Sequence, residues 1–269
     1  MTYICTKIKH INGRCMTDTE IGQYLTRIHV EDPVSVDLSS LRKLQWAHMQ
    51  TIAFENLDII QGIPLSLNRD DLFRKIVLNG RGGVCAELNG LFNWLLESLG
   101  YDVTSYLSRI ISEQNMYPLR SHRLMGVHFE DRTWLTDVGF YFEHHRQPIL
   151  LQDGVSQYDG IHRYFLQKEC IHGWIMRHER EDRKWHAELS FTEEPQLDVD
   201  FVAPLYYSQY HPLSPTNKCL KGSIYAGEEM HLIKGNEYTK TYHGKTVFRE
   251  TELSEEDVEK IFKTILKIG

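Results

Sequence analysis

The hydrophobic period of this chain changes at Gly100. Between residues 17 and 99, apolar side chains recur every three or four positions, which is the period of helices with one buried face. From Tyr101 onwards the apolar stretches are short, aromatic and β-branched, and polar turns separate them, which indicates strands. Helices followed by strands exclude an alternating parallel sheet and predict an α+β fold with segregated elements.

End signals support this division. Thr17 and Glu20 form a capping-box pair, Asn68 can cap a helix that stops near Gly80, and Gly100 can end the helix that follows Cys85. In the second part, WIMRHEREDRKWHAELSF, residues 174–191, is typical of a hairpin, and residues 222–250 are typical of three strands with glycine-containing turns. A last helix is expected after Ser254.

The bulk composition excludes several classes of protein. A formal net charge of −7 at pH 7 argues against a general nucleic-acid-binding protein. No apolar run is long enough for a transmembrane helix, and the N-terminal segment lacks the features of a signal peptide. The five cysteines are dispersed without a C-x-x-C pair, which argues against a disulfide framework and a structural zinc site. We therefore expect a cytoplasmic protein without a membrane or nucleic-acid partner. These cysteines are Cys5, Cys15, Cys85, Cys170 and Cys219.

Cys85 lies in RGGVCAELN, residues 81–89, between two glycines and a predicted helix. Gly82 and Gly83 permit an unusual backbone and the close approach of another group. The following helix directs unpaired N–H groups and a partial positive charge at its own N-terminus, which favours a reactive thiol there. A free cysteine is also often a small buried apolar residue, so these residues alone leave both interpretations open.

A nucleophilic cysteine needs a base, and the base needs a group that orients it. In SHRLMGVHFEDRTWLTDVGF, residues 121–140, His122 opens one predicted strand and Asp137 closes the next, so an antiparallel hairpin would make them neighbours. His128 is expected at the opposite end of that hairpin. His144 and His145 could form a metal pair, but no further ligands follow at a suitable spacing, which favours ordinary loop histidines.

Taken in order, several segments resemble the arylamine N-acetyltransferase family. FENLD at residues 54–58, RGGVC-x-E-L-N at residues 81–89, the Ser121–His122 pair, and LTDVGF at residues 135–140 match segments of that family. His122 and Asp137 are 15 residues apart, which is the family spacing. YYSQYHPLSP at residues 206–215 extends the resemblance towards the C-terminus.

This resemblance implies a fold and an activity. It implies a helical domain at residues 1–100 that carries the nucleophile, a β-barrel domain at residues 101–200, and an α/β lid domain at residues 201–269, around a core like that of cysteine proteases. A Cys85–His122–Asp137 triad would take an acetyl group from acetyl-CoA and pass it to an arylamine, arylhydroxylamine or hydrazine, by a ping-pong reaction that uses no metal. The partners would be CoA and a small-molecule acceptor; the oligomeric state is not implied.

The resemblance also suggests binding residues. Phe140, Val84 and Ser121 would contact the acceptor, and Tyr207 and Ser214 would contact CoA. Arg81 and Glu87, with Glu55, are expected to brace the nucleophile loop by pairing. The sequence departs from the family at four positions, which puts acceptor preference in question more than the reaction. These are Tyr141, where a glycine is usual, Val84 and Ala86, where aromatic residues are frequent, and Leu213, where some relatives carry a hydroxyl residue.

Two other functions fit part of this pattern. A thiol hydrolase of the protease or transglutaminase-like type can carry cysteine, histidine and aspartate in the same order. A protein that binds acyl-CoA but has lost turnover would retain the same residues. The RGG and FENLD segments favour the transferase over the hydrolase.

Overall fold

Residues 13–100 are mainly helical in the computed structural model, which describes residues 13–113, 115–179 and 182–268. The predicted capping box is present, because the Thr17 side chain accepts from Glu20 N and the Glu20 side chain accepts from Thr17 N. Gly100 ends the helical part in a left-handed conformation with φ 100°. The elements are α2 (Asp18–Arg27), α3 (Leu38–Thr51), α4 (Leu57–Ile60), α5 (Arg69–Leu72), π-helix η1 (Phe73–Leu78) and α6 (Cys85–Leu99).

The segment from Asn68 to Gly80 differs from the single helix expected there. Asn68 caps α5 as predicted, but the chain continues as the π-helix η1, in which Asn79 N donates to Arg74 O. A π-helix has a wider turn than an α-helix, and apolar periodicity does not distinguish the two. This wide turn carries Lys75, which becomes part of the site described below.

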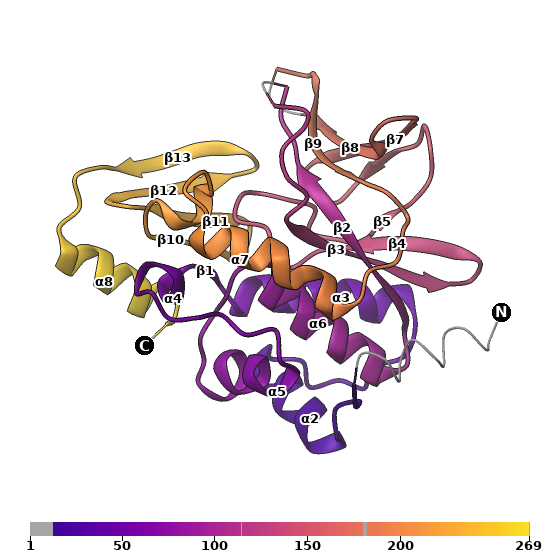
Figure 1. Ribbon diagram of the computed structural model, residues 1–269, viewed down its shortest axis with the longest axis horizontal. Coiled ribbons are helices and arrows are strands. Elements are labelled where there is room, and N and C mark those ends of the chain that lie inside the picture. Colours follow the sequence, from indigo (N-terminus) through magenta and orange to yellow (C-terminus); the bar gives the residue numbers. More distant parts are fainter. Residues whose placement is uncertain (1–12, 114, 180–181, 269) are drawn as a thin grey trace.

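Helix α6 is the central element of the helical part. Its side chains are buried from Ala86 to Glu97, and it packs against α2 and α5 on one side and against β2 and β3 on the other (Figure 1). A helix buried on all sides is fixed in position by its neighbours. Its first residue is Cys85, so the chain holds this cysteine at the junction between helices and strands.

The middle of the chain forms one antiparallel sheet in the order β5-β4-β3-β2-β9-β8-β7-β6. The two edge strands approach each other, since the Gln157 side chain donates to Leu150 O and accepts from Leu150 N. The sheet is therefore a nearly closed barrel, as the resemblance implied. Its strands are β2 (Asp102–Ile110), β3 (His122–Phe129), β4 (Arg132–Thr136), β5 (Ile149–Leu150), β6 (Ser156–Tyr158), β7 (Arg163–Glu169), β8 (Gly173–Glu179) and β9 (Trp185–Phe191).

The last part contains a five-stranded antiparallel sheet in the order β1-β10-β11-β12-β13. Strand β1 (Phe54–Glu55) comes from the helical part and pairs with β10. The prediction of three strands at residues 222–250 is wrong, because the structure has four there. His243 and Gly244, with φ 53° and 78°, make a tight turn that separates the fourth strand from the third. The strands are β10 (Lys221–Ala226), β11 (Glu229–Lys234), β12 (Glu237–Tyr242) and β13 (Lys245–Glu250), and α8 (Glu255–Thr264) follows.

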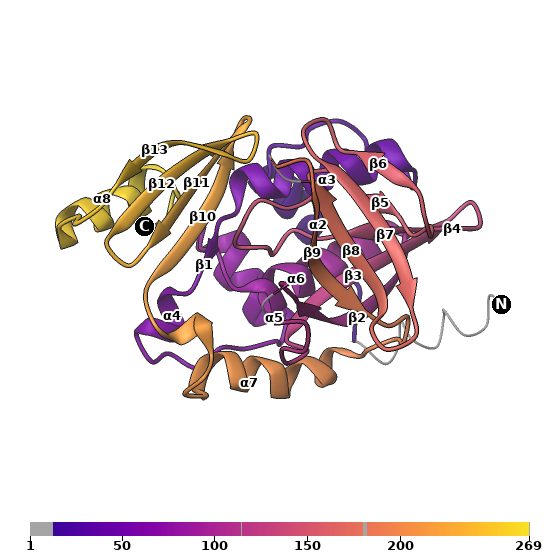
Figure 2. The same ribbon diagram turned by 90° about the horizontal axis from the view of Figure 1, so that it is seen from above.

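Helix α7 (Val202–Tyr210) connects the barrel to the C-terminal sheet. Figure 2 shows it along one long side of the molecule, from the barrel to the region of α4. Two short 3₁₀ helices flank it, η2 (Asp198–Phe201) and η3 (Pro215–Asn217). The predicted boundaries at residues 100 and 200 stay a prediction, and β1 shows that the first segment also contributes to the last sheet. Within the described residues, the helices lack the length and apolar character needed to cross a bilayer.

Candidate active site

The backbone before Cys85 lies directly against β1. Gly83 O accepts from Glu55 N at 3.0 Å, and Gly83 N donates to Ala53 O at 3.3 Å. A Cβ on Gly82 would lie only 2.1 Å from Ala53 O. The paired glycines are therefore required for close approach of two backbones, and they position Cys85 at the start of α6.

Arg81 braces this turn from outside. Its Nη2 lies 2.8 Å from Glu55 Oε1 and 2.9 Å from Asp58 Oδ1, while Glu55 Oε2 accepts from Leu57 N at 2.7 Å. The expected brace is present, but the pairing of Arg81 with Glu87 is wrong. The reason is that Arg81 extends towards the segment after β1, whereas Glu87 lies on the inner side of the turn.

Lys75 is the partner of Glu87. Its Nζ lies 2.8 Å from Glu87 Oε1 and 2.7 Å from Asp58 Oδ2. Burial raises the pKa of Glu87, and the Lys75 ammonium opposes that rise. The other carboxylate oxygen of Glu87 accepts from Val84 N at 3.0 Å, so the Lys75–Glu87 pair holds the residue just before Cys85. Sequence analysis missed Lys75, which lies on the π-helix and outside the motif.

His122 and Asp137 are in direct contact at the adjoining ends of the β3–β4 hairpin. His122 Nε2 lies 2.5 Å from Asp137 Oδ2, and both side chains are buried. Burial alone lowers the pKa of His122, but Asp137, helped by Cys85, raises it to about 10. Burial raises the pKa of Asp137, and the facing His122 outweighs it and holds that pKa well below its usual range. The pair is thus an imidazolium–carboxylate ion pair. His128 lies on β3 near the far end of the hairpin, as expected.

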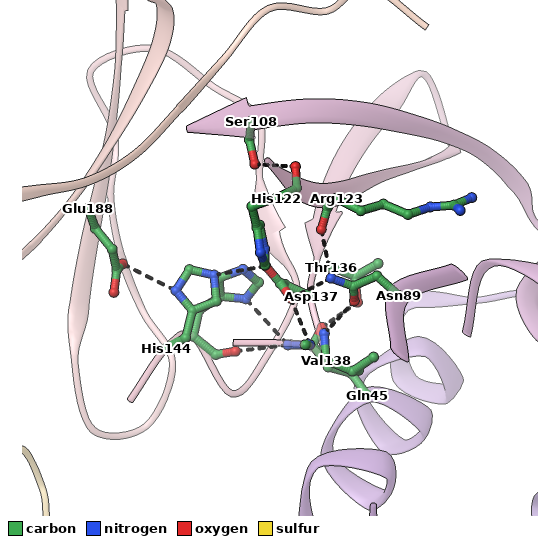
Figure 3. Close-up of polar contacts among 12 residues, drawn as sticks. Gln45, Asn89, Ser108, His122, Arg123, Thr136, Asp137, Val138, His144 and Glu188 are labelled. Atoms are coloured by element: carbon green, nitrogen blue, oxygen red, sulfur yellow. Dashed lines mark hydrogen bonds and ion pairs between the residues drawn. The ribbon is translucent and has the colours of Figure 1, made fainter. Parts of the chain in front are cut away.

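Asn89 fixes the aspartate relative to the helix of the cysteine. It lies one turn after Cys85 on α6, and its Nδ2 donates to Asp137 Oδ1 at 2.8 Å and to Arg123 O at 2.6 Å. Its Oδ1 accepts from Val138 N at 2.8 Å (Figure 3). Residues four apart share a helix face, so the position of Asn89 in RGGVCAELN was the signal that could have identified it.

Cys85 lies beside this pair at the helix N-terminus. Its thiol is half-buried, and Sγ lies 3.9 Å from Ser121 O. Cys85 is near enough to contribute to the raised pKa of His122. The second ring nitrogen of His122, Nδ1, is buried without a hydrogen-bond partner in the part of the chain that the structure describes. The structure therefore brings together all three residues expected for the triad.

His144 joins the same cluster, which sequence analysis did not foresee. It is fully buried on the loop after β4, with Nε2 3.6 Å from Asp137 Oδ2 and Nδ1 3.2 Å from Glu188 Oε2 on β9 (Figure 3). His145 is also buried and contacts Gln147 O at 2.8 Å. The two histidines lie on a loop, as expected, and both side chains are buried because the barrel and α3 enclose that loop.

A cleft of about 1160 Å³ opens beside this cluster, between the barrel and the C-terminal sheet. Cys85 does not line it; the cleft reaches the cluster at Phe140 and Glu188. Its far wall includes Leu232 of β11 and Thr241 of β12. Among the residues that the structure describes, no group of three or more histidine, cysteine or acidic side chains is arranged to hold a metal ion.

Known proteins match this chain over most of its length. A family model described as N-acetyltransferase matches residues 37–269. An arylamine N-acetyltransferase / N-hydroxyarylamine O-acetyltransferase of Salmonella typhimurium is 35% identical over 71% of this chain and 68% of its own. An arylamine N-acetyltransferase of Mycolicibacterium smegmatis is 31% identical over 80% of each chain. The chain belongs to the arylamine N-acetyltransferase family.

Solved structures of arylamine N-acetyltransferases share the fold. The enzyme of Salmonella typhimurium superimposes with a TM-score of 0.88 at 28% identity, over 94% of this chain and 92% of that one. The enzyme of Mycobacterium marinum in complex with CoA gives a TM-score of 0.86 at 27% identity, over 92% of each chain. Membership of this family makes the chain an acetyltransferase.

The residues expected to contact the acceptor are Phe140, Ser121 and Val84. Phe140 lines the cleft and lies edge-on to His122, with ring centroids 5.1 Å apart. Ser121 contacts the thiol through its carbonyl oxygen. Val84 is buried in the hydrophobic core and forms the N-cap position of α6. Their roles in binding stay predictions.

The residues expected to contact CoA lie around α7. Tyr207 is half-buried on that helix and stacks on His211, with ring centroids 4.6 Å apart. Ser214 is buried, and its hydroxyl donates to Ser208 O at 2.8 Å and accepts from Thr216 N at 3.2 Å. In this position the Ser214 hydroxyl stabilises the turn into η3.

Tyr141, where the family usually has glycine, joins two parts of the molecule. Its hydroxyl donates to Ile233 O of β11 at 2.8 Å, and its ring packs on Phe54 with centroids 5.4 Å apart. The side chain of Tyr141, one of the departures that put acceptor preference in question, thus lies against the C-terminal sheet. The exposed neighbour Phe142 lines the cleft instead.

Proposed function

We propose that this chain transfers an acetyl group from acetyl-CoA to an arylamine or hydrazine nitrogen, or to the oxygen of an arylhydroxylamine, through an acetyl-Cys85 intermediate. The observation that carries the proposal is the arrangement of Cys85 at the start of α6 beside the buried His122–Asp137 ion pair. Membership of the arylamine N-acetyltransferase family and the likeness to a relative solved with CoA support the choice of substrates.

In the first half of the reaction, the Cys85 thiolate attacks the thioester carbonyl carbon of acetyl-CoA. A bond forms between Sγ and that carbon, and the bond from the carbon to the CoA sulfur breaks. The leaving CoA thiolate takes the proton from the His122 imidazolium, which leaves acetyl-Cys85 and neutral His122. The N–H groups at the start of α6 favour negative charge at this position.

In the second half, the acceptor nitrogen attacks the acetyl carbonyl carbon. Neutral His122 takes the proton from the nitrogen, and the bond between Sγ and the carbonyl carbon breaks to restore the thiolate–imidazolium pair. Acetylation removes the Cys85 charge that helps to raise the pKa of His122, so the ring gives up its proton more readily at this stage. These steps require no metal ion.

The surrounding residues support these steps without reacting. Asp137 orients His122, and Asn89 and Gly139 N hold Asp137 through hydrogen bonds of 2.8 and 2.9 Å to Oδ1. We propose that Phe140, Ser121 and Val84 shape the acceptor pocket, and that Tyr207 and the turn held by Ser214 contribute to CoA binding. A helix-borne cysteine facing a sheet-borne histidine also supports the proposed likeness to cysteine proteases.

The acetyl-enzyme is tested by intact mass after incubation with acetyl-CoA. We expect the mass to increase by one acetyl group in the wild-type protein and in Cys170→Ala, which removes an exposed thiol, but not in Cys85→Ala. The absence of an adduct together with peptide cleavage would contradict the transferase and support a thiol hydrolase. An adduct that no arylamine or hydrazine discharges would instead indicate a protein that binds acyl-CoA without turnover.

A further inference from the structure

The Asp137 carboxylate faces two imidazole rings, of which the proposed mechanism uses one. His122 Nε2 lies 2.5 Å from Asp137 Oδ2, and His144 Nε2 lies 3.6 Å from the same oxygen. The longer distance exceeds that of a hydrogen bond, so His144 acts on Asp137 through charge. Both contacts are buried, where such attraction is little screened.

His144 is held in this position from three sides. Its Nδ1 lies 3.2 Å from Glu188 Oε2 on β9, and its ring stacks on Phe140 with centroids 4.2 Å apart. Its backbone N donates to the Tyr225 hydroxyl of β10 at 3.3 Å. A side chain fixed by the barrel, by its own loop and by the C-terminal sheet has one orientation relative to Asp137.

The His144 ring lies between two acidic side chains. Asp137 and Glu188 are buried carboxylates on its two sides, and a buried carboxylate requires a cation nearby. Burial raises the pKa of Glu188, but the facing imidazoles, His144 foremost, outweigh it and lower that pKa below its usual value. After His122, His144 also contributes to the lowered pKa of Asp137, so it acts on both carboxylates.

We propose that His144 is a positioning residue that shares the Asp137 carboxylate with His122 and is itself held by Glu188. The proposal rests on the proposed acetyl transfer through Cys85 and concerns its second half. A second imidazole beside the same oxygen of Asp137 weakens the hold of that carboxylate on the His122 proton. Neutral His122, the base that the acceptor nitrogen needs, is then available at lower pH.

The other titratable groups around His144 do not replace it. Burial, and next to it His144, lower the pKa of the adjoining His145 to about 3, so that ring is neutral. Burial raises the pKa values of Tyr164, on β7, and Tyr225, on β10, so their hydroxyls are uncharged. His178, on β8, lies 3.7 Å from Glu188 Oε1 and faces the other carboxylate oxygen. Of these groups, His144 is the one besides His122 that lies beside Asp137 Oδ2.

The test separates the two half-reactions and measures each against pH. CoA release on mixing with acetyl-CoA reports acetylation, and discharge of the acetyl-enzyme by 4-methoxyaniline reports the second half. In His144→Gln, we expect the midpoint of the pH profile of the discharge rate to move up by about one pH unit. Discharge at pH 7 is then ~10-fold slower than in the wild-type protein. Acetylation should change much less, because His122 is already an imidazolium at pH 7 when Cys85 attacks.

His128→Gln is the matched control, since His128 contacts Thr104 and Thr133 away from Asp137, and it should leave both profiles unchanged. The proposal would be overturned if His144→Gln slowed acetylation and discharge equally and left the midpoint of the discharge profile unchanged. It would also be overturned if the pH profiles of His144→Gln were the same as those of the wild-type protein. A wild-type protein that forms no acetyl adduct would instead refute the proposed function itself.

Glu188→Gln tests the same inference if His144→Gln fails to fold. We expect a smaller upward shift of the discharge midpoint, because His144 loses one of its two carboxylates. In the double variant, the shift should not exceed that of His144→Gln alone, since Glu188 acts through His144. Shifts that add in full would show that Glu188 acts independently and would contradict the proposal.

Discussion

The protonation of His122 determines the state in which Cys85 reacts. Burial by itself lowers the pKa of His122, but Asp137 and Cys85 raise it to about 10. The imidazolium therefore persists below about pH 10 and loses its proton only as the pH rises through that value. A cation that persists through neutral pH favours a thiolate beside it over a thiol.

The raised pKa of His122 affects how Cys85 reacts with iodoacetamide. We expect alkylation of Cys85 at a rate that changes little between about pH 6 and 8, and we expect His122→Ala to abolish this behaviour. The exposed Cys170 is an internal reference, because an ordinary thiol reacts about tenfold more slowly for each unit below pH 8. Peptide mass spectrometry distinguishes the two sites. Parallel profiles for Cys85 and Cys170 in the wild-type protein would refute the ion pair.

Single residues of the site differed in how far the sequence revealed them. Cys85 follows two glycines, and His122 and Asp137 mark the two ends of a hairpin, so local patterns made them candidates and the family resemblance selected them. His144 and Glu188 carry no such pattern. Their contact depends on how β9 lies against the loop after β4, which no local signal in the sequence specifies.

At the scale of elements, the site depends on how closely α6 approaches the loop after β4. Gly139 lies at this contact, where an added Cβ would come within 2.8 Å of Cys85 Cα and 3.0 Å of Asn89 Nδ2. Backbone atoms cannot move aside as the end of a flexible side chain can. The glycine therefore sets the distance between the helix of the cysteine and the loop of the aspartate.

Gly139→Ala should accordingly disturb both stability and reactivity. We expect the free energy of unfolding to fall by about 1–3 kcal/mol, and acetylation of Cys85 to slow, because α6 and the loop must separate. Gly22→Ala is the control: Gly22 lies within α2 with nothing within 4 Å of an added Cβ, and alanine there should be neutral or stabilise by up to ~1 kcal/mol. Urea unfolding and intact mass measure the two effects. Equal stability of both variants would contradict this account of Gly139.

Elements were predictable where their signals were local. The hairpin of β8 and β9 and the Ser254 cap of α8, whose side chain accepts from Asp257 N at 3.2 Å, follow from turn residues and capping patterns. The fourth strand of the C-terminal sheet was missed because the strands on either side of His243 and Gly244 have similar composition. The π-helix was missed because its apolar spacing resembles that of an α-helix.

On the scale of the whole molecule, the helical part, the barrel and the C-terminal sheet meet at the site. Strand β1 adds to β10, and Asn56 donates to Thr216 O at 2.7 Å and to Cys219 O at 2.9 Å. These contacts join residues far apart in the chain, so the sequence suggested the parts but not their connections. The closure of the barrel by Gln157 is of the same kind.

Tyr141 provides a test of this connection, because it is the residue of the site loop that contacts β11. Tyr141→Phe keeps the ring on Phe54 and removes the hydrogen bond to Ile233 O, which should weaken the attachment of the C-terminal sheet by ~1 kcal/mol. We expect amide hydrogen exchange in β11 to become about fivefold faster, while exchange in the barrel strands is unchanged. Tyr158→Phe is the matched control, since its exposed hydroxyl bonds only to the nearby Gly160 O in the described structure. Similar exchange in the two variants would mean that the hydroxyl of Tyr141 does not hold the sheet.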